Sequence, residues 1–103
     1  MLQPSPSDTH WPATGEAAMA KAAALGRRDG LAGRSRDFML EQFDGGLAVI
    51  DTTLQEPMPG APLSWQHSRL MLVAVRQCYA AGRHHGGDVR LEQERRQRLS
   101  ATG

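Results

Sequence analysis

Small residues dominate the first patterned stretch of the chain. Six of the eight positions from 17 to 24 are alanine, which has the highest helix propensity, so this stretch predicts a helix over 14–32. Thr14 is suited to cap its start, and Gly33 is suited to end it in a left-handed conformation. Four small residues stand four positions apart and therefore share one helix face: Ala18, Ala22, Gly26 and Gly30. Such a face lets a second helix approach closely.

Apolar residues of the next stretch recur at spacings of 4, 4, 3 and 4 residues, which predicts an amphipathic helix over 36–55 with Ser35 as its N-cap. The stripe consists of Met39, Phe43, Leu47, Ile50 and Leu54. Gly45-Gly46 interrupts the pattern, and the β-branched residues of 47–54 also suit a strand. We favour a helix because the stripe keeps its phase across the two glycines.

A proline-rich loop precedes the third apolar stretch. Prolines at 57, 59 and 62 prevent a continuous helix over 56–62. Ser64 is expected to cap a helix over 64–82, whose centre is apolar nearly all round and is therefore expected to be buried between the first two helices. The segment 88–99 starts at Asp88 and is mostly charged, with Glu–Arg pairs four residues apart. It is predicted to be a solvated fourth helix or a frayed tail.

These elements predict an all-α fold, a small three- to four-helix bundle with a flexible N-terminal arm. The chain has 103 residues, so 14–99 is expected to form a single helical domain, with 88–99 at its periphery. Residues 1–13 contain three prolines and are expected to form the arm. A chain this short has a thin core, and a homodimer is one way for it to bury more surface.

The composition favours a cytoplasmic protein. A lone cysteine, Cys78, excludes an internal disulfide and suits a reducing compartment. The N-terminal segment lacks the basic start and apolar run of a signal peptide. The longest strongly apolar run, residues 70–75, is far shorter than the roughly 20 residues that cross a bilayer. We therefore expect no membrane partner.

No motif indicates catalysis. The glycines at 26, 30 and 33 do not form a P-loop, because Arg28 and Arg34 occupy positions where that motif needs glycine and lysine. His84, His85 and Cys78 lack the ligand spacing of a zinc site. The sequence therefore predicts no enzyme activity, no metal site and no cofactor.

The charge pattern carries more information than the net charge of +1. Residues 37 to 56 contain five acids and no lysine or arginine. Four of the acids would project from one flank of the predicted helix: Asp37, Glu41, Asp44 and Asp51. This flank is either an ordinary solvated face or a partner-binding surface that fits a basic groove.

The leading hypothesis from the sequence is a small non-enzymatic interaction protein. It would bind, and modulate or inhibit, a larger protein or nucleoprotein machine through the acidic flank. Small inhibitors from phages and mobile elements, such as anti-CRISPR proteins, act in this way. A regulatory subunit whose helices complete a partner's core is a further alternative.

The second hypothesis rests on two arginine-rich sets, because arginine is suited to phosphate contacts. The first set surrounds the end of the first helix and comprises Arg27, Arg28, Arg34 and Arg36. The second comprises Arg83, Arg90, Arg95, Arg96 and Arg98. Both are also compatible with ordinary solvated surface. Aromatic residues are scarce beside them, which weakens a mode that stacks single-stranded bases.

One local resemblance bears on this hypothesis. The stretch GRRDGLAGRSRD, residues 26–37, resembles the helix and turn of bacterial ribosome modulation factor. The matching positions are Gly26, Gly30, Leu31, Ala32, Gly33, Arg34 and Ser35. The resemblance implies a small helical protein that binds ribosomal RNA and helps to silence ribosomes, with the first arginine set as its RNA contacts. Helix packing and capping alone would also explain these residues, and the family's later Pro-Tyr and tryptophan elements have no counterpart here.

Overall fold

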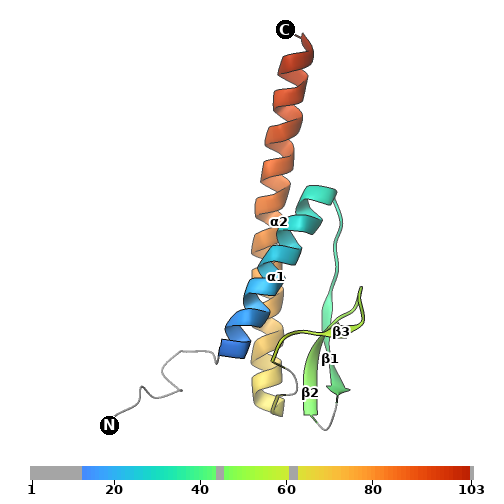
Figure 1. Ribbon diagram of the computed structural model, residues 1–103, viewed down its shortest axis with the longest axis vertical. Helices are drawn as coiled ribbons and strands as arrows, with labels where there is room; N and C mark the ends of the chain where they lie inside the picture. Colours follow the sequence, from blue (N-terminus) through green and yellow to red (C-terminus); the bar gives the residue numbers. More distant parts are fainter. Residues whose placement is uncertain (1–12, 44–45, 61–62, 103) are drawn as a thin grey trace, which may run out of the picture.

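The chain folds into two helices with a small antiparallel sheet between them in sequence (Figure 1). The computed structural model describes residues 13–43, 46–60 and 63–102. Helix α1 spans Ala13–Ala32 and helix α2 spans Trp65–Thr102. The strands are β1 (Phe38–Phe43), β2 (Gly46–Asp51) and β3 (Glu56–Pro57), in the order β1-β2-β3. The predicted all-α bundle of three to four helices is therefore wrong.

The error lies in the segment 36–55, which forms a β-hairpin and not a helix. Strands β1 and β2 pair in register from Phe38 opposite Asp51 to Phe43 opposite Gly46. The burial alternates along β1, where Phe38 is buried and Met39 is exposed. The helical spacing of the stripe was misleading because it joined positions on two strands, such as Met39 and its cross-strand partner Ile50. The alternative interpretation of 47–54 as β-structure is correct for β2.

Helix α1 matches its prediction closely. It begins at Ala13, one residue before the expected cap, and the structure describes nothing of the expected arm before that residue. Gly33 has a φ of 69°, and its N–H donates to the Gly30 carbonyl at 3.3 Å. The Arg34 N–H donates to the Asp29 carbonyl at 2.7 Å, which completes a Schellman motif. The predicted helix stop at Gly33 is confirmed, but Ser35 caps no helix because the chain continues in extended form into β1.

Helix α2 starts as predicted and ends much later. The His67 N–H donates to the Ser64 hydroxyl at 3.3 Å, so Ser64 is the N-cap. The helix continues through Gly82 to Thr102, and the predicted separate segment 88–99 forms its last turns. Asp88 is therefore not a cap but a mid-helix residue, 3.5 Å from His84. These last turns project past α1 in Figure 1 and are mostly exposed, as predicted for a solvated helix.

The two helices cross with their backbones in contact. A Cβ atom added at Gly26 or Gly30 would lie within 3.0 Å of α2 backbone atoms of Tyr79 or Arg83. Added at Gly82, it would lie within 3.0 Å of the α1 backbone at Ala23. The predicted small-residue face of α1 is therefore confirmed as a helix-packing face. This contact compensates for the roughly 1 kcal/mol that each helical glycine costs relative to alanine.

The core lies where α2 meets both α1 and the inner face of the sheet. Its buried members are Ala18, Ala22, Leu25, Phe38, Val49, Met58, Met71, Val75 and Tyr79. The Phe38 and Tyr79 rings meet edge to face, with centroids 5.4 Å apart. Helix α2 thus packs against both of its neighbours, with a sheet in place of the predicted second helix. The predicted burial of its whole apolar centre is wrong, because Leu70 and Val73 are more than half exposed. Neither described helix combines the length and the apolar character needed to cross a membrane.

The glycine crossing generates a direct stability test. Gly26→Ala should lower the free energy of unfolding by about 1–3 kcal/mol, because the new methyl group has to push two backbones apart. Gly87→Ala is the matched control, since a Cβ there meets nothing within 4 Å. The control should raise the free energy of unfolding by roughly 0.5–1 kcal/mol through helix propensity. Urea unfolding followed by circular dichroism measures both; equal stabilisation by the two variants would contradict a close crossing.

Candidate nucleic-acid interface

The segment that follows α1 is anchored by one largely buried arginine side chain. Arg36 Nε donates to Asp29 Oδ2 at 2.7 Å, and Arg36 Nη2 donates to Asp29 Oδ1 at 3.2 Å, so the pair is bidentate. Arg36 Nη1 donates to Asp51 Oδ2 at 2.7 Å. Only 12% of the Arg36 side chain is exposed, and both carboxylates are buried. One guanidinium therefore ties the end of α1 to the end of β2.

Tyr79 links the same network to α2. Its hydroxyl donates to Asp29 Oδ2 at 2.6 Å and accepts from the Arg36 N–H at 2.8 Å. The second oxygen of Asp51 accepts from the backbone N–H of Thr53 at 2.9 Å, in the turn after β2. Among the described residues, no buried side-chain nitrogen or oxygen atom lacks a hydrogen-bond partner. The polar groups buried here are thus satisfied and hold three elements in one arrangement.

The network shifts the protonation equilibria of its members. Hydrogen bonding by Arg36 lowers the pKa of Asp29 below its ordinary 3.8; burial opposes this shift, and the Tyr79 hydroxyl adds to it. Burial raises the pKa of Tyr79 above its ordinary 10.0, and the neighbouring Asp29 carboxylate raises it further. The hydrogen bond to Asp29 likewise raises the pKa of Arg36. Asp29 is therefore held ionised and Tyr79 neutral at ordinary pH.

The predicted helical flank of acids does not form, because the described acids of this segment lie on or next to β1 and β2. Asp51 is buried in the Arg36 network, with 1% of the residue exposed. Asp37 is exposed, and its carboxylate pairs with Arg76 at 3.2 Å. Glu41 is exposed on β1, and Asp44 lies outside the described residues. The three described acids, Asp37, Glu41 and Asp51, therefore share no exposed face, because Asp51 is buried.

Two arginines of α2 bond to the backbone of the segment after α1 and of the first residue of β1. Arg83 Nε donates to the Arg34 carbonyl at 2.6 Å, and Arg76 Nη2 donates to the Phe38 carbonyl at 2.6 Å. Together with the Arg36 contacts, they fix where the chain leaves α1 and where β1 begins. Arg36, a predicted nucleic-acid contact, is a structural residue; the other three of its set remain at the surface.

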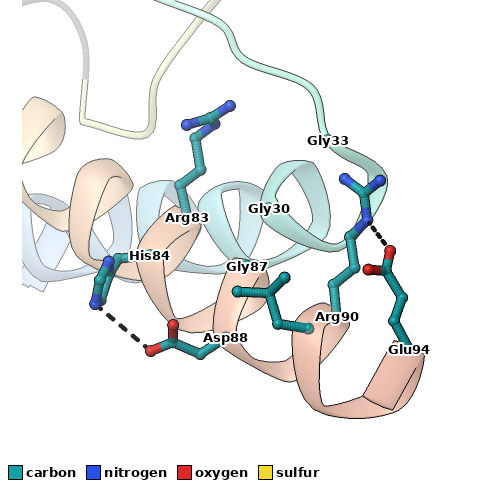
Figure 2. A pocket seen from close by; sticks show the side chains of 9 residues that line it. Gly30, Gly33, Arg83, His84, Gly87, Asp88, Arg90 and Glu94 are labelled. Atoms are coloured by element: carbon teal, nitrogen blue, oxygen red, sulfur yellow. Dashed lines mark hydrogen bonds and ion pairs between the residues drawn. The ribbon is translucent and has the colours of Figure 1, made fainter. Parts of the chain in front are cut away.

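Arg27, Arg28 and Arg34 are exposed around the C-terminal end of α1, where the partial negative charge of the helix dipole favours cations. Beside them, Arg83 and Arg90 rise from the same side of α2 toward the end of α1 (Figure 2). They flank an open depression of about 550 Å³. Its lining residues are Gly30, Gly33, Arg83, His84, Gly87, Asp88, Arg90, Leu91 and Glu94.

Positive charge is concentrated at this end of the molecule. The last turns of α1, its cap and the second half of α2 carry eight surface arginines: Arg27, Arg28, Arg34, Arg83, Arg90, Arg95, Arg96 and Arg98. The same region carries three exposed or half-exposed carboxylates. Glu92 pairs with Arg95 at 2.9 Å and with Arg96 at 3.3 Å, and Glu94 pairs with Arg90 at 3.1 Å. By charge, the eight arginines outnumber the three carboxylates, so this part of the described surface is positively charged and suits an anionic partner.

Asp29 and Tyr79 were not identified from the sequence as parts of a site. A signal for Asp29 was present, because this carboxylate stands four residues after Leu25 and directly before Gly30, on the packing face of α1. A carboxylate on such a face needs a cationic partner when it is buried. In the part of the chain that the structure describes, no three His, Cys, Asp or Glu side chains come together as a metal site.

Replacing Asp29 tests the network. Asp29→Asn should lower the free energy of unfolding at neutral pH by about 3 kcal/mol, because the variant cannot form the bidentate charge pair with Arg36. In the unaltered protein, the contribution of Asp29 is present above pH 3.8 and is lost as the pH falls through its lowered folded-state pKa. The stability gap between the two proteins should therefore narrow in that acid range.

Urea midpoints at neutral pH and below pH 3.8 measure this gap. Asp88→Asn, at an exposed helix position, is the control and should leave stability nearly unchanged. A gap of the same size at both pH values would show that the ionised form of Asp29 has no special role.

Comparisons of this chain with protein-family models, with curated proteins and with solved structures found no match, so its geometry is the basis for any functional conclusion.

Proposed function

We propose that this protein binds the phosphate backbone of a structured RNA and thereby modulates a nucleoprotein particle. The observation that carries the proposal is the cluster of eight arginines around the end of α1 and the second half of α2. Guanidinium groups form paired hydrogen bonds with phosphate oxygens, and several of them on one surface displace many counterions.

The site supports contacts with an RNA helix better than the reading of single-stranded bases. Its surface members are arginines of α1, of the cap that follows it and of α2, and the one tyrosine nearby, Tyr79, is buried in the Arg36 network. Single-strand binders use exposed aromatic rings on which bases stack. Double-helical RNA is recognised mainly through its shape, its phosphates and its 2′-hydroxyls.

The local resemblance to ribosome modulation factor agrees with this proposal. Residues 26–37 form the last turns of α1, its cap and the anchored segment, and three of their arginines belong to the exposed cluster. A ribosome-associated RNA is therefore the first partner to test. The proposal keeps the sequence-based class of a non-enzymatic interaction protein, but moves the contact from the acidic residues to the arginines.

Paired charge variants test the proposed surface. Replacing the exposed Arg27 and Arg28 together by alanine should weaken binding to a fluorescent RNA hairpin. It should also reduce the slope of log affinity against log salt by about 0.9 for each phosphate that the protein no longer neutralises. The control replaces Lys21 and Arg69, two positive charges outside the cluster, by alanine. It should change the slope of log affinity against log salt little. Fluorescence anisotropy across a salt series gives both slopes.

Equal reductions in affinity for the two double variants would show non-specific attraction and would overturn the assignment of the cluster. Salt-independent binding, or none, would reject RNA as the partner. Capture from a bacterial lysate with and without RNase then identifies the particle. Ribosomal proteins that disappear after RNase treatment would support a ribosomal partner.

A further inference from the structure

Strand β1 leaves one edge of the sheet open. The strand order β1-β2-β3 places β1 at the end of the sheet, and no other described strand pairs with its outer side. The opposite edge is covered in part by β3 and by a bridge between Leu47 and Leu63. An open edge presents unpaired backbone N–H and C=O groups, which are a template for another strand.

The hydrogen-bond pattern shows which residues of β1 face outward. The Thr52 N–H donates to the Asp37 carbonyl at 3.1 Å, so the odd-numbered residues of this stretch pair with β2. On the side of β2 away from β1, the Val49 carbonyl accepts from the Met58 N–H at 2.7 Å. The backbone groups of β2 therefore also point alternately to one side and to the other. The backbone groups of Phe38, Leu40 and Gln42 therefore point to the open edge. The Phe38 carbonyl already accepts from Arg76 Nη2 of α2 at 2.6 Å, so one of its two lone pairs is occupied.

Apart from the Arg76 guanidinium of α2 at the Phe38 carbonyl, strand β1 lacks the features that usually protect an edge. Its sequence, FMLEQF, contains no proline and no lysine, and all six of its residues pair in register with β2 without a bulge. Its single charge, Glu41, lies with Met39 on the outer sheet face, where 44% of Met39 is exposed. The edge is thus regular and mostly apolar, and beyond the Phe38 carbonyl its outward backbone groups at Leu40 and Gln42 are open to pairing.

We propose that this edge pairs with β1 of a second copy of the chain, antiparallel and centred on Leu40. In this register Leu40 faces its own counterpart, and Phe38 faces the partner's Gln42. All outward N–H and C=O groups of the three residues then find partners. The Phe38 carbonyl has two lone pairs and accepts from both Arg76 and the partner strand. The two sheets become one continuous sheet.

Charge selects this register over its neighbour. Centring on Leu40 places Met39 opposite the partner's Glu41, so an apolar residue faces each carboxylate. A shift that centres the pair on Glu41 would put two carboxylates directly opposite each other, which destabilises a sheet. A shift toward Gln42 pairs less of the strand. The pairing is short, so the dimer is expected to be weak and to depend on concentration.

Two substitutions at one exposed position test both the dimer and its register. Met39→Arg places a guanidinium opposite the partner's Glu41 and should tighten the dimer several-fold. Met39→Glu creates a pair of facing carboxylates and should weaken it by a similar factor. Sedimentation velocity from micromolar to near-millimolar protein measures the dissociation constants, and circular dichroism checks that both variants remain folded.

A third variant removes the backbone donor itself. Gln42→Pro deletes an N–H that points to the open edge and leaves the bonds to β2 in place, so it should abolish dimerisation while the monomer stays folded. A protein that is monomeric at every concentration would overturn the proposal. A dimer that responds identically to Met39→Arg and Met39→Glu, or that survives Gln42→Pro in a folded protein, would equally overturn the pairing of β1. These outcomes do not depend on RNA binding.

Discussion

The direct contact between the backbones of α1 and α2 is the constraint on which the rest of the structure is built. Four glycines, two on each helix, leave no side chain between the axes at the crossing: Gly26, Gly30, Gly82 and Gly86. Because the helices meet so closely, the last turns of α1 lie against the middle of α2. This position brings Asp29 to the hydroxyl of Tyr79 and the end of α1 to the side chain of Arg83.

The crossing alone does not determine where the chain goes after α1. Arg36 does so, since its guanidinium needs carboxylates from α1 and from β2 at the same time. A buried charge without partners costs several kcal/mol, so an arrangement that misplaces β2 is strongly disfavoured. The hairpin is therefore held at one end by an ion-pair network and along its inner face by Phe38 and Val49 in the core.

Arginine serves opposite purposes at nearly adjacent positions. Arg36 is internal and neutralised by two carboxylates, whereas Arg34 is exposed and its backbone carbonyl is engaged by Arg83. Two of the chain's acids, Asp29 and Asp51, are buried in ion pairs with Arg36 and add no negative charge to the surface. What remains at the surface is a predominantly basic end, formed by α1 and α2, and a sheet whose exposed charges are acidic.

The local features of this protein could be predicted from its sequence: helix α1, its small-residue face, its glycine stop and the cap of α2 at Ser64. Each follows from residues close in the chain, where propensity, spacing and capping act directly. The hairpin over 38–51 emerges only in the folded chain, because its apolar spacing fits both a helix and two facing strands. The same holds for the internal position of Arg36 and Asp51 and the exposed position of Arg27 and Arg28. Residue type alone could not distinguish them, because the partners that neutralise a charge come from distant segments of the folded chain.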